Sequence, residues 1–171
     1  IADYYRSPVE LGWERNVAFD HEFVGRAALK ADVDAPERTI RTLVWDDDAV
    51  VAAYASLFDV REPAKYMDMP HQQHRAMVAD EVRAGGGPVG VSTCRGYSAT
   101  FREMLSLCVL DVAHAEPGTE VTVVWGEGGD PASPAVERHE SREIPATVAP
   151  APYKPDHRRA DLHALAEDVA G

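Results

Sequence analysis

The spacing of apolar residues predicts a chain that is mostly β, with a few short helices. Alternation is clearest in residues 120–125, where apolar and polar residues exchange places as in a strand that buries one face. Residues 39–45 are rich in β-branched and aromatic types, which favour strands. Residues 47–58 instead predict a short helix, because their apolar side chains recur at helical spacing. The aspartates at 46–48 suit the first turn of this helix, where acidic residues are favourable.

Strands and turn signals continue along the rest of the chain. Residues 77–82 and 89–93 flank the glycine run at 85–87, a pattern that predicts a hairpin. Residues 104–110 form an apolar run broken by one serine, too short to span a bilayer, and we expect a strand buried on both faces. A last strand is expected at 144–148. Together these strands predict a barrel or a sandwich.

The first residues have a different pattern. Residues 13–19 alternate loosely and predict a strand. The spacing of Phe23, Ala27 and Ala31 then predicts a short helix. The polar segment 32–37, which contains a proline, is the best candidate for a domain boundary.

These patterns divide an α+β, mostly β chain into three parts. We expect residues 1–37 to end one domain, residues 38–150 to form a barrel or jelly-roll-like domain, and residues 151–171 to form a tail. The tail begins with prolines, which exclude a regular element, and a short helix at 161–170 competes with disorder. The chain enters a dense aromatic segment directly after Ile1, so we expect a piece of a longer protein, with a processed natural terminus as the alternative.

Composition narrows the function classes. A length of 171 residues allows one domain, or one domain plus a piece of another. The net charge of −12 argues against a general nucleic-acid binder, because no positive field attracts phosphates. No apolar run is long enough for a transmembrane helix. The two cysteines, Cys94 and Cys108, do not make a disulfide framework and are typical of buried thiols in a cytoplasmic protein.

Most groups that could carry chemistry have a simpler structural interpretation. His71 and His74 follow Asp68 and could share a metal, but no third ligand stands at a recognised spacing, so a solvated loop is the better interpretation. Nothing in the sequence supplies Cys94 with a fixed base, and Cys108 lies in an apolar run that indicates the core.

Two further kinds of segment are interpreted as structural. The glycine-rich segments at 85–87 and 126–129 match neither phosphate-loop pattern and are expected to be turns. The acidic residues at 46–48 and 80–81 are expected to lie on solvated faces rather than to act as a general acid or base.

The aromatic residues near the start are the most informative group. Tyr4, Tyr5 and Trp13 flank the turn around Pro8. An aromatic ring offers a flat face on which a heterocycle can stack, and a phenol can donate or accept a proton. Composition alone favours ordinary packing for these three side chains, in the core or at its rim.

The order of several sequence segments instead supports a functional role for these aromatic residues. The segments are SPVELGW at 7–13, VAFDHEFVGRAAL at 17–29, GVSTCRGYS at 90–98, MLSLCVLDV at 104–112, PGTEV at 117–121 and IPATV at 144–148. In this order they resemble the glycine cleavage T-protein (aminomethyltransferase) family across roughly residues 4–150. The first two resemble the end of the family's folate-binding region, and the third resembles a loop of its small domain.

A second set of segments is similar to one branch of that family. These segments are GWER at 12–15, FDHEF at 19–23, TLVW at 42–45, VVWGE at 123–127 and ATVAPAPY at 146–153. They resemble the tetrahydrofolate-dependent aromatic O-demethylases, which act on vanillate- and syringate-like methoxy acids. The resemblance implies methyl transfer from an aryl methyl ether to N5 of tetrahydrofolate, without a metal or a corrinoid.

The resemblance also implies roles for two residues. Tyr4 matches a tyrosine at the methyl-transfer centre of that branch and is our candidate catalytic residue, with Tyr5 as the alternative if the alignment slips by one. Trp13 matches a tryptophan that contacts the folate and is our candidate cofactor-binding residue. The family's other site residues lie in an earlier part of its fold. The implied partners are therefore a small methoxy-aromatic acid or aminomethyl donor and the N-terminal part of the same protein.

Two other functions stay open at this point. The chain could belong to a protein that transfers an aminomethyl group in glycine cleavage, or that demethylates a methylated amine. It could also be a non-catalytic β-barrel binding module, which the strand-rich segment 38–150 would suit.

Overall fold

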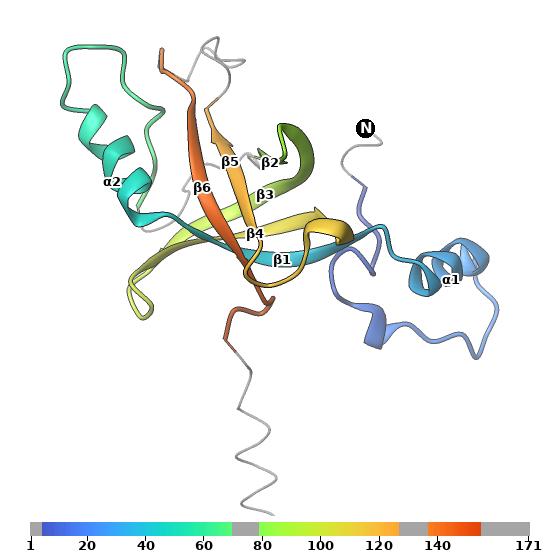
Figure 1. The fold of residues 1–171 in the computed structure, drawn as a ribbon. Helices are drawn as coiled ribbons and strands as arrows, with labels where there is room; N and C mark the ends of the chain where they lie inside the picture. Colours follow the sequence, from blue (N-terminus) through green and yellow to red (C-terminus); the bar gives the residue numbers. More distant parts are fainter. Residues whose placement is uncertain (1–4, 70–78, 127–136, 155–171) are drawn as a thin grey trace, which may run out of the picture.

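Six strands close into one antiparallel barrel. The computed structural model describes residues 5–69, 79–126 and 137–154. The barrel order is β1-β4-β3-β2-β5-β6 (Figure 1). The elements in chain order are η2 (Glu14–Asn16), α1 (Arg26–Asp34), β1 (Arg38–Trp45), α2 (Asp47–Ser56), β2 (Asp80–Ala84), β3 (Gly87–Ser98), β4 (Glu103–Asp111), η3 (Val112–His114), β5 (Glu120–Trp125) and β6 (Arg142–Ala149).

The strands predicted after residue 38 and the helix after β1 are confirmed. The turn between β2 and β3 needs left-handed backbone, and Gly85 and Gly86 supply it with φ values of 59° and 83°. Asp46 caps α2, because its side chain accepts a hydrogen bond from the backbone N–H of Ala49. The predicted mostly β fold with a barrel is therefore correct.

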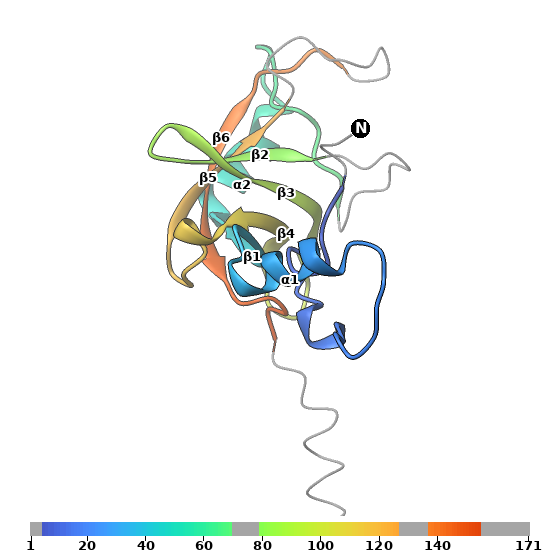
Figure 2. The ribbon, with the colours of Figure 1, turned by 90° about the vertical axis from the view of Figure 1, so that its right-hand side faces the viewer.

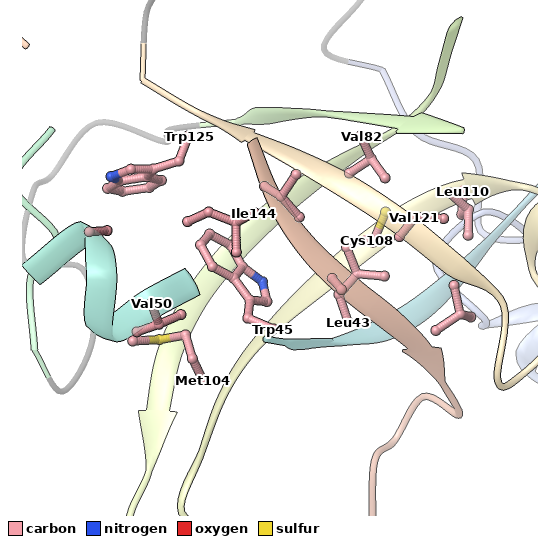
Figure 3. Close-up of a cluster of buried hydrophobic side chains, with 14 of the residues drawn as sticks. Leu43, Trp45, Val50, Val82, Met104, Cys108, Leu110, Val121, Trp125 and Ile144 are labelled. Carbon is pink, nitrogen blue, oxygen red and sulfur yellow. The ribbon is translucent and has the colours of Figure 1, made fainter. Parts of the chain in front are cut away.

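Inward side chains fill the barrel. Leu43, Cys108 and Leu110 lie on the β1–β4 wall, and Val82 and Val121 come from β2 and β5 (Figure 3). All five are buried. Burying a large aliphatic side chain stabilises a fold by roughly 1.5–3 kcal/mol, so this cluster holds the strands together.

A short polar chain crosses one end of this core. The indole N–H of Trp45 donates to the hydroxyl of Ser106 over 2.9 Å, and Ser92 donates to the same hydroxyl over 2.8 Å. All three residues are buried. Trp45 also packs edge-on against Trp125, with ring centroids 6.0 Å apart. The hydrogen bonds satisfy polar groups that would otherwise destabilise the interior.

The segment before β1 forms a separate unit beside the barrel. Figure 1 shows α1 beyond the start of β1, whereas α2 lies at the other end of the barrel near β6. Figure 2 views the molecule from the side on which α1 lies. Val9 is the one buried hydrophobic residue of the described part of this unit, 5–37. No residue of α1 is buried. This unit therefore has almost no core of its own.

The structure corrects two predictions for this unit. Residues 13–19 do not form a strand, because the backbone N–H groups of Asn16 and Val17 donate locally, to the carbonyl groups of Trp13 and Glu14, and close η2. The following helix begins at Arg26 rather than near residue 23, since Gly25 before it has a φ of 89°. It then continues through Asp34, into the segment expected to be a linker.

Two further predictions are wrong. Residues 104–110 are not buried on both faces, because alternate residues of β4 point inward and outward and the outward Leu107 is 38% exposed. Asp80 is not solvated but buried, while its neighbour Glu81 is exposed as expected. No helix in the described residues is long and apolar enough to cross a membrane. The three-part division at residues 37 and 150 stays a prediction.

Candidate functional site

A capped turn near the start of the described chain positions the aromatic candidates. The backbone N–H of Ser7 donates to the Glu10 carboxylate over 2.8 Å, and the backbone N–H of Glu10 donates to the Ser7 hydroxyl over 3.1 Å. Such reciprocal bonds satisfy backbone groups at the start of a helical turn, where Pro8 lacks an N–H that would need a partner. The sequence Ser-Pro-Val-Glu therefore specifies this turn locally.

Gly12 ends the turn and sets it against the barrel. Its N–H donates to the carbonyl of Val9 over 2.9 Å, and its φ is 70°, a left-handed value that favours glycine. A β-carbon at this position would lie 3.1 Å from the side chain of Ile40 in β1. The missing side chain thus permits the close approach of the turn to β1, and this approach places Trp13 at the edge of the barrel.

Trp13 presents its side chain to solvent. Its backbone N–H donates to the carbonyl of Pro8 over 2.8 Å, whereas 60% of the residue surface is exposed. Tyr5 is 73% exposed. Neither residue is therefore packed in the core, one of the two positions, core or rim, that composition alone favoured. An exposed indole on a hydrogen-bonded turn can stack a planar heterocycle without first leaving a packed position.

Tyr4, the candidate catalytic residue, lies outside the described residues. The structure therefore does not give its distance from Trp13, and the two assigned roles stay predictions. His71, His74 and the glycines after 126 also lie outside the described residues, as does the expected helix at 161–170.

A small aromatic cluster follows Trp13 in the chain. The rings of Phe19 and Phe23 stack with centroids 6.3 Å apart. The guanidinium of Arg26 lies 5.7 Å from the Phe19 ring centroid and donates to the Phe19 carbonyl over 2.7 Å. These contacts hold the loop before α1 in a defined path, although its side chains are not buried in a core.

A second group of polar residues closes the end of the barrel near α2. The guanidinium of Arg95, which is buried, lies 4.9 Å from the Trp125 ring centroid. It donates to the carbonyl of Asp68 over 2.9 Å. The Nε atom of Arg95 has no hydrogen-bond partner within the described ranges. Burial lowers the pKa of this guanidinium, with Tyr54, Asp80 and Asp68 acting in the opposite direction.

The same group holds the segment that follows α2. The phenol of Tyr54 donates to the carbonyl of Met67, and burial raises the pKa of this phenol. The indole N–H of Trp125 donates to the carbonyl of Lys65 over 2.9 Å. Sequence reasoning missed this group, because no local pattern indicates that Arg95 in the middle of β3 points inward. These contacts anchor the segment 65–68, and we assign them a structural role.

The prediction of two buried thiols is correct for Cys108 and wrong for Cys94. Cys108 is buried, and burial raises the pKa of its thiol to about 12, as expected for a core residue. Cys94 is exposed, with an unusual φ of 52°, rather than one of two buried thiols. Among the residues that the structure describes, no three His, Cys, Asp or Glu side chains are grouped so that they could hold a metal ion.

Comparison with known proteins agrees with the resemblance seen in the sequence. The chain is 40% identical over 154 residues to a syringate O-demethylase from Sphingobium sp. (strain NBRC 103272 / SYK-6), covering 90% of this chain and 33% of that protein. It is 36% identical over 157 residues to a sesamin methylene transferase from Sinomonas sp. (strain No.22), covering 86% of this chain and 33% of that protein. The predicted family resemblance is confirmed.

The resemblance holds for a limited portion of these proteins. The chain spans about a third of the length of the curated relatives it matches. The glycine cleavage aminomethyltransferase T from Bartonella henselae has the same fold over 86% of this chain and 32% of its own, with a TM-score of 0.52 and 16% identity. No family model matches the chain. The barrel is thus one part of an aminomethyltransferase-like architecture.

Proposed function

We propose that this chain is the C-terminal part of a tetrahydrofolate-dependent one-carbon transferase that removes a methyl group from an aryl methyl ether. The observation that carries the proposal is the 40% identity to a syringate O-demethylase over 154 residues. The aminomethyltransferase fold supports the same class of chemistry, although at 16% identity it does not select a substrate. The proposed donor is a methoxy-aromatic acid.

The described residues fit a folate at one point. Trp13 offers an exposed indole face on a turn held by hydrogen bonds, and such a face suits the planar pterin ring. When bound, tetrahydrofolate would supply the N5 atom that accepts the methyl group. Trp13 would hold the pterin and so help to align N5 with the methyl carbon, which is the positional part of catalysis.

Tyr4 is proposed to act on the leaving oxygen. As the methyl carbon–oxygen bond breaks, the oxygen of the ether keeps the electron pair and becomes a phenoxide. A phenol that donates a hydrogen bond or a proton to this oxygen stabilises the charge, and general acid catalysis contributes about 10²–10⁴ in rate. This role is transferred from the resemblance, with Tyr5 as the alternative.

The test uses the intact protein that contains this chain. Incubation with tetrahydrofolate and a panel of methoxybenzoates should yield the phenol and 5-methyltetrahydrofolate in equal amounts. Tyr4→Phe should lower kcat by at least about 10²-fold while folate affinity changes little, whereas Tyr5→Phe, the matched control, should do neither. Trp13→Ala should weaken folate binding. The proposal would be overturned if the protein formed no product from any methoxy-aromatic in the panel. Equal loss of turnover and folate affinity in Tyr4→Phe would overturn the role of Tyr4 as an acid.

Methylene transfer is a second candidate, favoured by the 36% identity to a sesamin methylene transferase. The product distinguishes the two reactions. A methyl donor leaves its carbon on tetrahydrofolate as a methyl group, whereas a methylenedioxy-aromatic donor leaves it one oxidation level higher, as a methylene group. Mass spectrometry of the folate product after incubation with each donor class decides between them.

A further inference from the structure

The Glu10 carboxylate closes the start of the turn that precedes Trp13. It accepts a hydrogen bond from the backbone N–H of Ser7, while the Ser7 hydroxyl accepts one from the backbone N–H of Glu10. The two residues thus form a capping box, which holds a helical turn at its first residue. Among the described residues, the carboxylate has no other hydrogen-bond or ion-pair partner. The contacts of this side chain therefore serve the turn alone.

The end of the same turn is closed at Trp13 itself. The backbone N–H of Trp13 donates to the carbonyl of Pro8 over 2.8 Å, and the backbone N–H of Gly12 donates to the carbonyl of Val9 over 2.9 Å. With the positive φ of Gly12, these two bonds make a Schellman motif, in which Trp13 is the second residue after the turn. The carbonyl of Trp13 accepts a hydrogen bond from the backbone N–H of Asn16 over 2.9 Å. Both backbone polar groups of Trp13 are therefore fixed.

The turn is attached to the barrel, whereas the indole that it carries is left open. Val9 is 7% exposed, and a β-carbon on Gly12 would lie 3.1 Å from the Ile40 side chain in β1. Trp13 is 60% exposed, so its large apolar surface contributes little to packing. A side chain left open on a backbone that is held at both ends is the arrangement expected of a preorganised binding platform.

We propose that Glu10 is a positioning residue for ligand binding: through the capped turn it fixes the place of the Trp13 indole, against which the pterin ring stacks. This inference rests on the proposed function, which supplies the folate. In this role Glu10 acts on the ligand only through Trp13. When the capping box is lost, the turn opens in a fraction of the molecules, and the apparent affinity falls with the fraction that keeps the binding geometry.

A double-mutant cycle on the intact protein that contains this chain tests the proposal. Glu10→Ala should raise the Kd for tetrahydrofolate about three- to tenfold, the range expected when a helical turn loses a cap. Glu10→Gln keeps an oxygen at the same reach and should stay within about twofold of the parent protein. In a Trp13→Ala background, Glu10→Ala should change the Kd by less than about twofold, because no indole remains to be positioned.

The cycle also separates indirect from direct action. An equal factor for Glu10→Ala in both backgrounds would overturn the proposal, since it would show that Glu10 acts on the ligand directly or on the whole fold. Ser7→Ala removes the other bond of the box and should raise the Kd by a similar factor, whereas Ser7→Thr keeps the hydroxyl and should not. Unchanged affinity in both Glu10→Ala and Ser7→Ala would likewise overturn it.

A matched control removes a carboxylate that takes no part in the turn. Glu22→Ala deletes a side chain that is 91% exposed and belongs to the same unit, and it should leave the Kd unchanged. A rise in Kd equal to that of Glu10→Ala would contradict the proposal, because it would trace both effects to the loss of a negative charge.

A ligand-free measurement separates this inference from the proposed function. In protein labelled with fluorotryptophan, the fluorine NMR resonance of Trp13 is assigned by its loss in Trp13→Phe. Glu10→Ala should shift or broaden this resonance while those of the buried Trp45 and Trp125 stay in place, and Glu10→Gln should restore it. An unchanged Trp13 resonance in Glu10→Ala would overturn the positioning role whether or not folate binds. A changed resonance in a protein without affinity for tetrahydrofolate would refute the proposed function, while the role of Glu10 in fixing the indole would stand.

Discussion

The hydrogen-bonded chain of Trp45, Ser106 and Ser92 gives the sharpest test of how this barrel is held together. In Ser106→Ala the hydroxyl that accepts from both neighbours is removed. Trp45 is 1% exposed and Ser92 is fully buried, so water cannot readily replace the lost partner. The indole N–H, which has no other partner in this chain of bonds, is then left unsatisfied.

The magnitude follows from these contacts. Leaving a buried donor without a partner costs about 1–3 kcal/mol, and Ser92 loses a second bond of about 0.5–1.5 kcal/mol unless its hydroxyl rotates to another acceptor. We therefore expect Ser106→Ala to lower the free energy of unfolding by about 2–4 kcal/mol. In a Trp45→Phe background the unsatisfied indole is absent, so the same substitution should cost at least about 1 kcal/mol less.

The assay is denaturant unfolding of all four members of this cycle, followed by far-ultraviolet circular dichroism. The m-value should stay constant across the four proteins, which shows that the substitutions alter stability rather than the extent of unfolding. Ser98→Ala is a suitable control, since this serine accepts a bond from an exposed backbone N–H. A loss below about 0.5 kcal/mol in Ser106→Ala, or an equal loss in both backgrounds, would refute the reasoning.

Three further predictions concern β3 and the two thiols of this chain. In Gly90→Ala the new β-carbon would lie 2.6 Å from a backbone carbonyl oxygen of β4, so unfolding should occur at clearly lower denaturant, whereas Gly87→Ala, with no atom within 4 Å, should change the midpoint little. At pH 8 a thiol reagent should modify Cys94 alone until the protein unfolds, because the pKa of the buried Cys108 is raised to about 12. Rapid modification of two thiols at pH 8 would contradict this assignment. Because folding raises the pKa of Cys108, the protonated thiol contributes fully to stability below the ordinary thiol pKa, and this contribution is lost as pH rises toward 12. Cys108→Ala should therefore reduce the decline of the unfolding midpoint with pH in this range.

The barrel could be predicted largely from local signals. The signals that predict its strands each lie within a few residues of sequence. Examples are the turn residues Gly85 and Gly86 and the alternation in β5, and the structure contains the strands that they predict. Local signals also gave the start of α2, where Asp46 caps the helix. The first unit was harder, because the loose alternation after Trp13 resembles a strand although its backbone bonds close a single turn.

Tertiary position explains the other errors. The apolar run at 104–110 fits a strand buried on both faces, and only the closed barrel shows that Leu107 points outward. Asp80 and Arg95 are polar residues without any pattern that predicts burial, yet both are buried. Of the candidate site, sequence reasoning located an aromatic residue that is exposed, Trp13, through a family resemblance rather than through periodicity.

The anchoring of residues 65–68 has a consequence for how this protein can diversify. Tyr54, Arg95 and Trp125 all donate to main-chain carbonyl groups in this segment. Every amino acid offers the same carbonyl, so these donors fix the path of the segment without constraining its exposed side chains, whereas Met67 in the same segment is buried in the core. Tyr66 and Met69, both exposed, stand along or beside that path. Homologues can therefore vary the chemistry displayed here without rebuilding the end of the barrel.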